Sequence, residues 1–136
     1  MSANKLSTTD PCWIAHTPEA LNPLFIEAIS AGNVNAVAAL FEAEGQLAPR
    51  PGQPVVQGQS AIRATVQGWL NLQLQFLASS RVATQTGDLA LLRGPWQVQL
   101  LGPNGQLQTQ FGRGLEIARR QPDGSWRYVL AVDGDE

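Results

Sequence analysis

A turn signal near the end of the chain constrains its fold more than any other feature. Pro122, Asp123 and Gly124 separate two runs that are rich in apolar and β-favouring residues. Proline presets the φ angle of one turn residue and glycine accepts a positive φ at another, so this tripeptide predicts a β-hairpin. Pro103-Asn104-Gly105 separates two earlier runs of the same kind and predicts a second hairpin. The C-terminal half is therefore expected to be antiparallel sheet.

Four long strands account for this half, at residues 75–86, 88–101, 107–120 and 126–132. Pro95 lies inside the second strand and has no amide donor, which predicts a bulge or a break there. Gly112 and Gly114 lie inside the third strand, where glycines mark a bend or the close approach of another group.

The first half reads as helical. Thr17-Pro18-Glu19 combines an N-cap, a proline at the first helical position and an acid in the first turn. This helix should end at Ala31-Gly32, and Asn33 should cap a second helix whose apolar face runs to Phe41. Prolines and glycines over 45–58 exclude helix but allow short strands at 46–48 and 54–57, before a third helix that opens at 58–60.

Size and composition predict a polar tail at residues 1–12 and one α+β domain at 13–136. The formal net charge of −2 provides no electrostatic basis for binding nucleic acid or an anionic membrane. Cys12 is the only cysteine, which excludes an intramolecular disulfide and a thiolate metal cluster. The N-terminus shows no signal-peptide pattern and no apolar run could span a bilayer, so a cytoplasmic setting is predicted.

Large apolar residues occupy both faces of the predicted strands. Leu89 and Leu91 have one parity, whereas Leu92, Trp96 and Val98 have the other. The helices can cover only one face of the sheet, so the other face is expected to pack against a second subunit. This pattern predicts a homodimer.

Several short motifs along the chain carry a family resemblance. They are the Gly32-Asn33 link between two helices, followed by LFEAE (40–44), VQGQSAIR (56–63), GDLA (87–90), GRGLEIARR (112–120) and DGSWR (123–127). With these motifs the chain resembles the nuclear transport factor 2-like superfamily, and more narrowly its ketosteroid-isomerase-like and polyketide-cyclase-like (SnoaL-like) bacterial members.

The resemblance implies a conical α+β barrel. Its curved, mainly antiparallel sheet would carry three N-terminal helices on the concave face, with an apolar pocket between the layers. Homodimers that form through the sheet are common among such proteins. No cofactor is implied.

The resemblance also implies the three-residue catalytic pattern of the steroid isomerases, a base and two donors. Only one of its three positions carries a suitable residue in this chain. The base carboxylate falls at Ala48 or Pro49, neither of which can accept a proton. The tyrosine donor falls at Phe25, which has no hydroxyl, and the second donor falls at Glu116.

Glu116 has two interpretations. It could be a carboxyl in an apolar pocket that donates to a ligand oxygen, or a structural carboxylate paired with an arginine such as Arg93, Arg113 or Arg127. His16 and Asp88 are the other candidate catalytic groups, and no metal site is predicted. The candidate ligand-binding residues are Phe25, Phe41, Trp69, Trp96 and Glu116.

Three functions follow from these candidates. The first is a protein that binds a small apolar or amphipathic molecule and lacks the isomerase base. The second is an enzyme of the isomerase, cyclase or dehydratase type that uses Glu116. The third is a non-catalytic dimerisation module whose cavity is packed shut by Trp69, Phe76 and Trp96. A pocket of several hundred Å³ favours the first two, because ligand sites are typically of that size.

Overall fold

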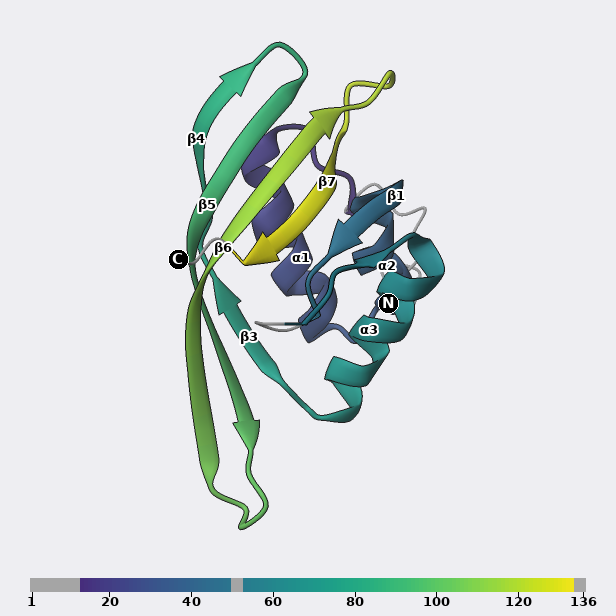
Figure 1. Ribbon diagram of the computed structural model, residues 1–136. Helices are drawn as coiled ribbons and strands as arrows, with labels where there is room; N and C mark the ends of the chain where they lie inside the picture. The colour runs from purple at the N-terminus through teal and green to yellow at the C-terminus, as the bar shows by residue number, and fades with distance from the viewer. Residues whose placement is uncertain (1–12, 50–52, 134–136) are drawn as a thin grey trace.

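A single seven-stranded sheet organises the molecule (Figure 1). The computed structural model describes residues 13–49 and 53–133, so the predicted tail and Cys12 lie outside the described residues. The helical elements are η3 (Pro18–Ala20), α1 (Leu21–Ser30), α2 (Val34–Ala39) and α3 (Gln59–Asn71). The strands are β1 (Phe41–Leu47), β2 (Val56–Gln57), β3 (Gln75–Ala78), β4 (Arg81–Thr86), β5 (Leu89–Leu101), β6 (Leu107–Arg120) and β7 (Trp126–Asp133).

The strand order is β2-β1-β7-β6-β5-β3, and β4 also pairs with β5. Only the β1–β7 pair is parallel, while the other pairs are antiparallel. The predicted α+β class with a mainly antiparallel sheet is confirmed. In Figure 1, α1 lies within the curve of the sheet, where it contacts β3 and β7.

Both predicted hairpin turns are present. Gly124 has φ 88° and Gly105 has φ 76°, the left-handed conformation that glycine tolerates best. The Asp123 carboxylate accepts hydrogen bonds from the amide and the hydroxyl of Ser125, at 2.9 and 2.6 Å. The turn at Asp123 is thereby held by its own side chains, as short polar residues do in turns.

The strand predicted over 75–86 is in fact two strands. β3 pairs with one half of β5 and β4 pairs with the other half. Ser79 and Ser80, which link them, belong to neither strand. A Cβ at Gly94 would overlap the Ser79 carbonyl oxygen, so the backbone that links β3 to β4 passes directly over Gly94.

The prediction of a bulge or a break at Pro95 is wrong for β5, the strand that contains this residue. Pairing between β5 and β6 stays in register through Pro95 and Arg113. The Pro95 carbonyl accepts from the Ser79 amide at 3.2 Å, so the donor-less nitrogen of Pro95 also faces the gap between β3 and β4. The missing amide donor of Pro95 therefore removes no hydrogen bond from the β5–β6 pairing. The interruption lies instead in the neighbouring segment, between β3 and β4.

The helices differ from the expected three-helix cover. α2 has six residues and ends at Ala39, and Phe41 begins β1 instead of completing a helical face. The carbonyls at this junction accept hydrogen bonds from outside the helix. The Leu40 carbonyl accepts from the Tyr128 amide at 2.7 Å, and the Gln59 side-chain amide donates to the carbonyls of Ala38 and Phe41. α3 packs on α2 and on β1 and β2, at one edge of the sheet.

The core lies between α1, α2, α3 and the concave face of the sheet. Its largest fully buried side chains are Tyr128, Phe41, Leu21, Leu40, Ile62, Leu92, Val37 and Val66. Among the described residues, no helix is both long enough and apolar enough to cross a bilayer.

Candidate functional site

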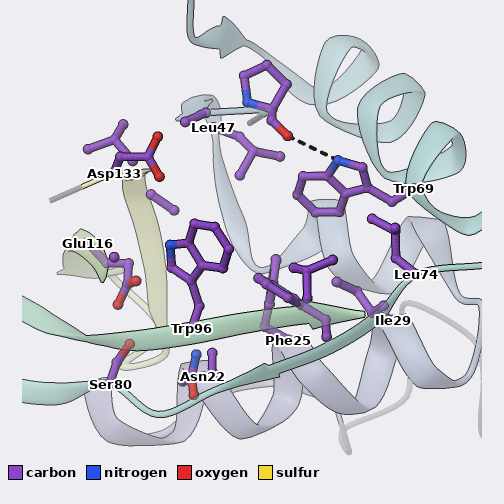
Figure 2. A pocket seen from close by; sticks show the side chains of 18 of the residues that line it. Asn22, Phe25, Ile29, Leu47, Trp69, Leu74, Ser80, Trp96, Glu116 and Asp133 are labelled. Carbon is purple, nitrogen blue, oxygen red and sulfur yellow. Dashed lines mark hydrogen bonds between the residues drawn. The ribbon is translucent and has the colours of Figure 1, made fainter. Parts of the chain in front are cut away.

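A cavity of about 670 Å³ opens between α1, the end of α3 and the concave side of β3, β5, β6 and β7. Aromatic side chains supply much of its wall (Figure 2). These are Phe25, Trp69, Phe76, Trp96 and Tyr128. Trp69, Phe76 and Trp96, which could have packed the cavity shut, instead line an open volume.

The two tryptophans are held in place by different means. The Trp69 indole N–H donates to the Pro49 carbonyl at 3.2 Å, which fixes that ring against the loop after β1. The Trp96 ring lies against Gly112 of β6, since a Cβ added to Gly112 would overlap the ring. Gly112 has no side chain and therefore leaves room for the Trp96 ring. This contact is the close approach predicted from Gly112 and Gly114.

Glu116 projects from β6 into the polar end of this cavity (Figure 2). The residue is only 9% exposed, and its Oε1 atom has no hydrogen-bond partner among the described residues. Burial raises the pKa of the Glu116 carboxyl above its ordinary value, and a hydrogen bond with Ser80 offsets part of the rise. A carboxyl in this environment is poised to meet a polar group of a bound molecule.

Tyr128 and Asn22 extend the polar end of the cavity. Burial and the nearby negative charge of Glu116 raise the pKa of the Tyr128 phenol well above its ordinary value, while a hydrogen bond with Asn22 opposes the rise. The phenol therefore stays protonated at neutral pH and can donate a hydrogen bond.

The candidate residues from the sequence separate into two groups. Phe25, Trp69, Trp96 and Glu116 all line the cavity, as do Ala48 and Pro49 at the position that the resemblance assigns to the base. Phe41 does not line it, because it is fully buried against Phe25 and Tyr128 in the core.

His16 and Asp88 do not line the cavity either. His16 is exposed ahead of η3, and Asp88 lies in the β4–β5 turn, where it pairs with Arg120 at 2.7 Å. Glu116 has none of the arginine partners considered for it, since the described ion pairs are Arg119–Glu42 and Arg120–Asp88.

Five polar residues of the cavity escaped the sequence analysis: Asn22, Ser80, Gln110, Tyr128 and Asp133. Strand alternation puts Asp133 on the same face of β7 as Ala131, but only the pairing of Ala131 with Glu116 in the folded sheet brings that face to the cavity. Ser80 gave no signal, since it lies in a break that the sequence did not predict. Within the ranges 13–49 and 53–133, no group of three or more His, Cys, Asp or Glu side chains is placed to hold a metal ion.

The sequence matches no known family model and no curated protein. Solved structures are similar over most of the chain. An NTF2-like protein with a cystatin-like fold from Novosphingobium aromaticivorans has a TM-score of 0.71 at 21% identity, covering 85% of this chain and 77% of that one. A ketosteroid isomerase-like protein from Erwinia carotovora atroseptica has a TM-score of 0.70 at 19% identity, covering 84% and 89%.

A third structure, described as a candidate dehydratase of the NTF2-like family from Streptomyces avermitilis, has a TM-score of 0.69 at 24% identity and covers 83% and 89%. This chain has the NTF2-like fold. At such low identities the likeness concerns architecture, and one NTF2-like fold can carry unrelated activities. The function has to be argued from the cavity itself.

Proposed function

We propose that this protein binds a small, largely apolar molecule in the cavity, with the Glu116 carboxyl as its polar anchor. The observation that carries the proposal is a buried carboxyl, with one oxygen unpartnered, at the end of an aromatic-lined volume of about 670 Å³. Ligand sites are typically of this size and combine an apolar wall with a few polar groups that orient the ligand.

Loss of the isomerase base supports binding over steroid isomerisation. Ala48 and Pro49 line the cavity at the position that the resemblance gives to that base, and neither side chain ionises. Phe25 likewise offers an aromatic ring and no hydroxyl.

An enzyme that uses Glu116 is the second candidate. It is favoured by the raised pKa of Glu116, because perturbed carboxyls in cavities are frequent in acid–base catalysis. Similar structures described as ketosteroid isomerase-like or as a candidate dehydratase motivate the choice of substrates to test. Turnover of a Δ5-3-ketosteroid that Glu116→Gln abolishes would replace the binding proposal with this one.

A neutral fluorescent probe tests the binding proposal. N-phenyl-1-naphthylamine should bind the protein with one-to-one stoichiometry and shifted emission, and native mass spectrometry of protein purified from its own host should show a retained small molecule. Ala78→Trp would fill the cavity that Ala78 lines, and it should abolish probe binding.

Ala83→Trp is the matched control, because Ala83 is exposed on β4 and does not line the cavity. Circular dichroism of both variants establishes that they fold. Equal probe binding by Ala78→Trp and the wild type would refute the cavity as the binding site.

A further inference from the structure

A hydrogen-bond donor and an acceptor border the same space at the polar end of the cavity, over the backbone of Gly114. A Cβ built on Gly114 would lie 2.8 Å from Glu116 Oε2 and 3.7 Å from Trp96 Cδ1. Cδ1 is bonded to the indole nitrogen, so the N–H edge of Trp96 and the Glu116 carboxyl flank this space. Figure 2 shows the nitrogen of Trp96 on the side of the ring that faces Glu116. Because Gly114 has no side chain, nothing of its own comes between the two groups.

The indole N–H of Trp96 is an unused donor. No hydrogen bond joins it to any residue that the structure describes, whereas the N–H of Trp69 donates to the Pro49 carbonyl. Trp96 lines the cavity and its ring nitrogen is not fully buried, so the N–H is accessible to a bound molecule. An indole N–H donates and does not accept, and the ligand atom that meets it must therefore be an acceptor.

The Glu116 carboxyl is an acceptor that the protein uses only in part. Ser80 hydrogen-bonds with the carboxyl, yet Oε1 has no partner among the described residues. The terminal torsion of a glutamate side chain is soft, so the carboxyl can turn this oxygen toward a ligand. Both the ionised and the protonated carboxyl keep an acceptor oxygen. A donor on the ligand therefore satisfies the carboxyl in either state.

The charges around this space favour a neutral ligand. None of the described cavity-lining residues is an arginine, lysine or histidine, so an anionic ligand would meet no opposite charge there. Burial favours the neutral form of Glu116, which is a weaker partner for a cation than a carboxylate is. Asp133, the other acidic residue of the lining, already interacts with another group.

We propose that the cavity selects a neutral primary carboxamide or lactam on an apolar skeleton, whose N–H donates to the Glu116 carboxyl and whose carbonyl accepts from the Trp96 N–H. This inference rests on the proposed function and specifies the ligand class of that site. An amide carries its donor and its acceptor on two atoms joined through one carbon, which matches two protein groups on either side of one space. A hydroxyl carries both functions on one atom, and a ketone has no donor. The apolar skeleton fills the aromatic volume.

Three naphthalenes whose side groups have nearly the same shape test the proposal. Naphthalene-2-carboxamide offers a donor and an acceptor, 2-acetylnaphthalene has a methyl group in place of the amide nitrogen and offers only the acceptor, and 2-isopropenylnaphthalene offers neither. Calorimetry with the wild type should show that the amide binds about tenfold more tightly than the ketone, because only the amide donates to the buried carboxyl. The ketone should bind about fivefold more tightly than the alkene, through the Trp96 N–H.

Two cavity variants separate the two hydrogen bonds. Glu116→Met removes the acceptor at nearly constant length, and it should abolish the preference for the amide over the ketone. Trp96→Phe removes the N–H and keeps an aromatic ring, so it should weaken amide and ketone binding equally when each is compared with the alkene, which reports the loss of ring area. Glu44→Met is the matched control, because it makes the same substitution at an exposed position outside the cavity, and it should leave both preferences intact.

The order of the three ligands on the wild type tests the proposal whether or not a variant folds. Amide and ketone affinities within twofold of each other, or an amide preference that folded Glu116→Met retains, would overturn the amide inference and leave the binding function standing. The same holds if N-phenyl-1-naphthylamine binds and none of the three ligands does. If neither the probe nor any of the three ligands binds, both proposals fail.

Discussion

Two residues near the polar end of the cavity show how single positions shape it. Gly94 permits the β3–β4 backbone to cross β5, which brings Ser80 to Glu116. Glu116 keeps a carboxyl in surroundings that disfavour its charge. Both can be tested by substitutions that change few atoms.

Gly94→Ala should destabilise the protein by about 1–3 kcal/mol, since its Cβ would overlap the Ser79 carbonyl oxygen and force the backbone to move. Urea unfolding followed by tryptophan fluorescence measures the change. Gly68→Ala is the control: Gly68 lies inside α3 with open space around it, so alanine should stabilise the helix there by up to about 1 kcal/mol. A Gly94→Ala variant as stable as the wild type would contradict the close approach of the Ser79 backbone to Gly94.

Glu116→Gln should increase the stability at neutral pH. The folded-state pKa of Glu116 lies above its ordinary value of 4.5, so the folded state holds its proton longer than the unfolded state does. The wild type therefore loses stability as the pH rises from 4.5 through the raised pKa, and the loss stays constant above it.

The difference in unfolding free energy between Glu116→Gln and the wild type should grow across that pH window. Glu44→Gln, at an exposed site, provides the comparison for loss of one carboxyl. A difference that does not change with pH would show that the Glu116 carboxyl is not desolvated in the folded protein.

At the scale of elements, one side chain joins α3 to the junction of α2 and β1. Gln59 Nε2 lies 2.9 Å from the Ala38 carbonyl oxygen, 3.1 Å from that of Phe41 and 3.3 Å from that of Glu42. These carbonyls belong to the turn where the chain leaves the helix and enters the sheet. The first residue of α3 therefore stabilises a turn about twenty residues earlier.

Gln59→Ala should cost about 1–3 kcal/mol, because it leaves partly buried carbonyls without their donor. Gln59→Glu should be at least as damaging, since a carboxylate cannot donate to these oxygens. Gln67→Ala in the same helix removes only an exposed bond to Asn71 and should change stability by less than about 0.5 kcal/mol. Thermal unfolding of the three variants checks the order, and equal losses for Gln59→Ala and Gln67→Ala would contradict it.

At the scale of the whole molecule, the outer ends of β5 and β6 extend beyond the rest of the sheet (Figure 1). β3 pairs with β5 only as far as Gln99, and β7 pairs with β6 only from Gly114 onward. The remaining two-stranded ribbon exposes Leu101 and Leu107, at 57% and 62%. Phe111, opposite Gln97 where β3 still pairs with β5, is exposed at 73%. Two-stranded ribbons are marginally stable in water, and clustered exposed apolar residues commonly mark an interface.

We propose that a second copy of the chain packs against this ribbon and the outer sheet face in a twofold homodimer, because one self-complementary patch then serves both subunits. Sedimentation equilibrium at micromolar concentration should give twice the 14.6 kDa chain mass. Leu101→Lys combined with Leu107→Glu places opposite charges on a cross-strand pair, and should produce a folded monomer.

Val55→Lys, which charges an exposed apolar residue elsewhere, should remain dimeric. A wild-type protein that is monomeric throughout this concentration range would refute the interface.

The sequence alone determined the local architecture, because turns, caps and strand alternation depend on neighbouring residues. It located β6, both hairpin turns and the Asn33 cap, whose side chain accepts from the Ala36 amide. It could not determine that Ser79 crosses Gly94, that Phe41 leaves a helical pattern to begin β1, or that Asp133 faces Gly114. Those arrangements depend on contacts between residues distant along the chain, and only the pairing of the strands brings them together.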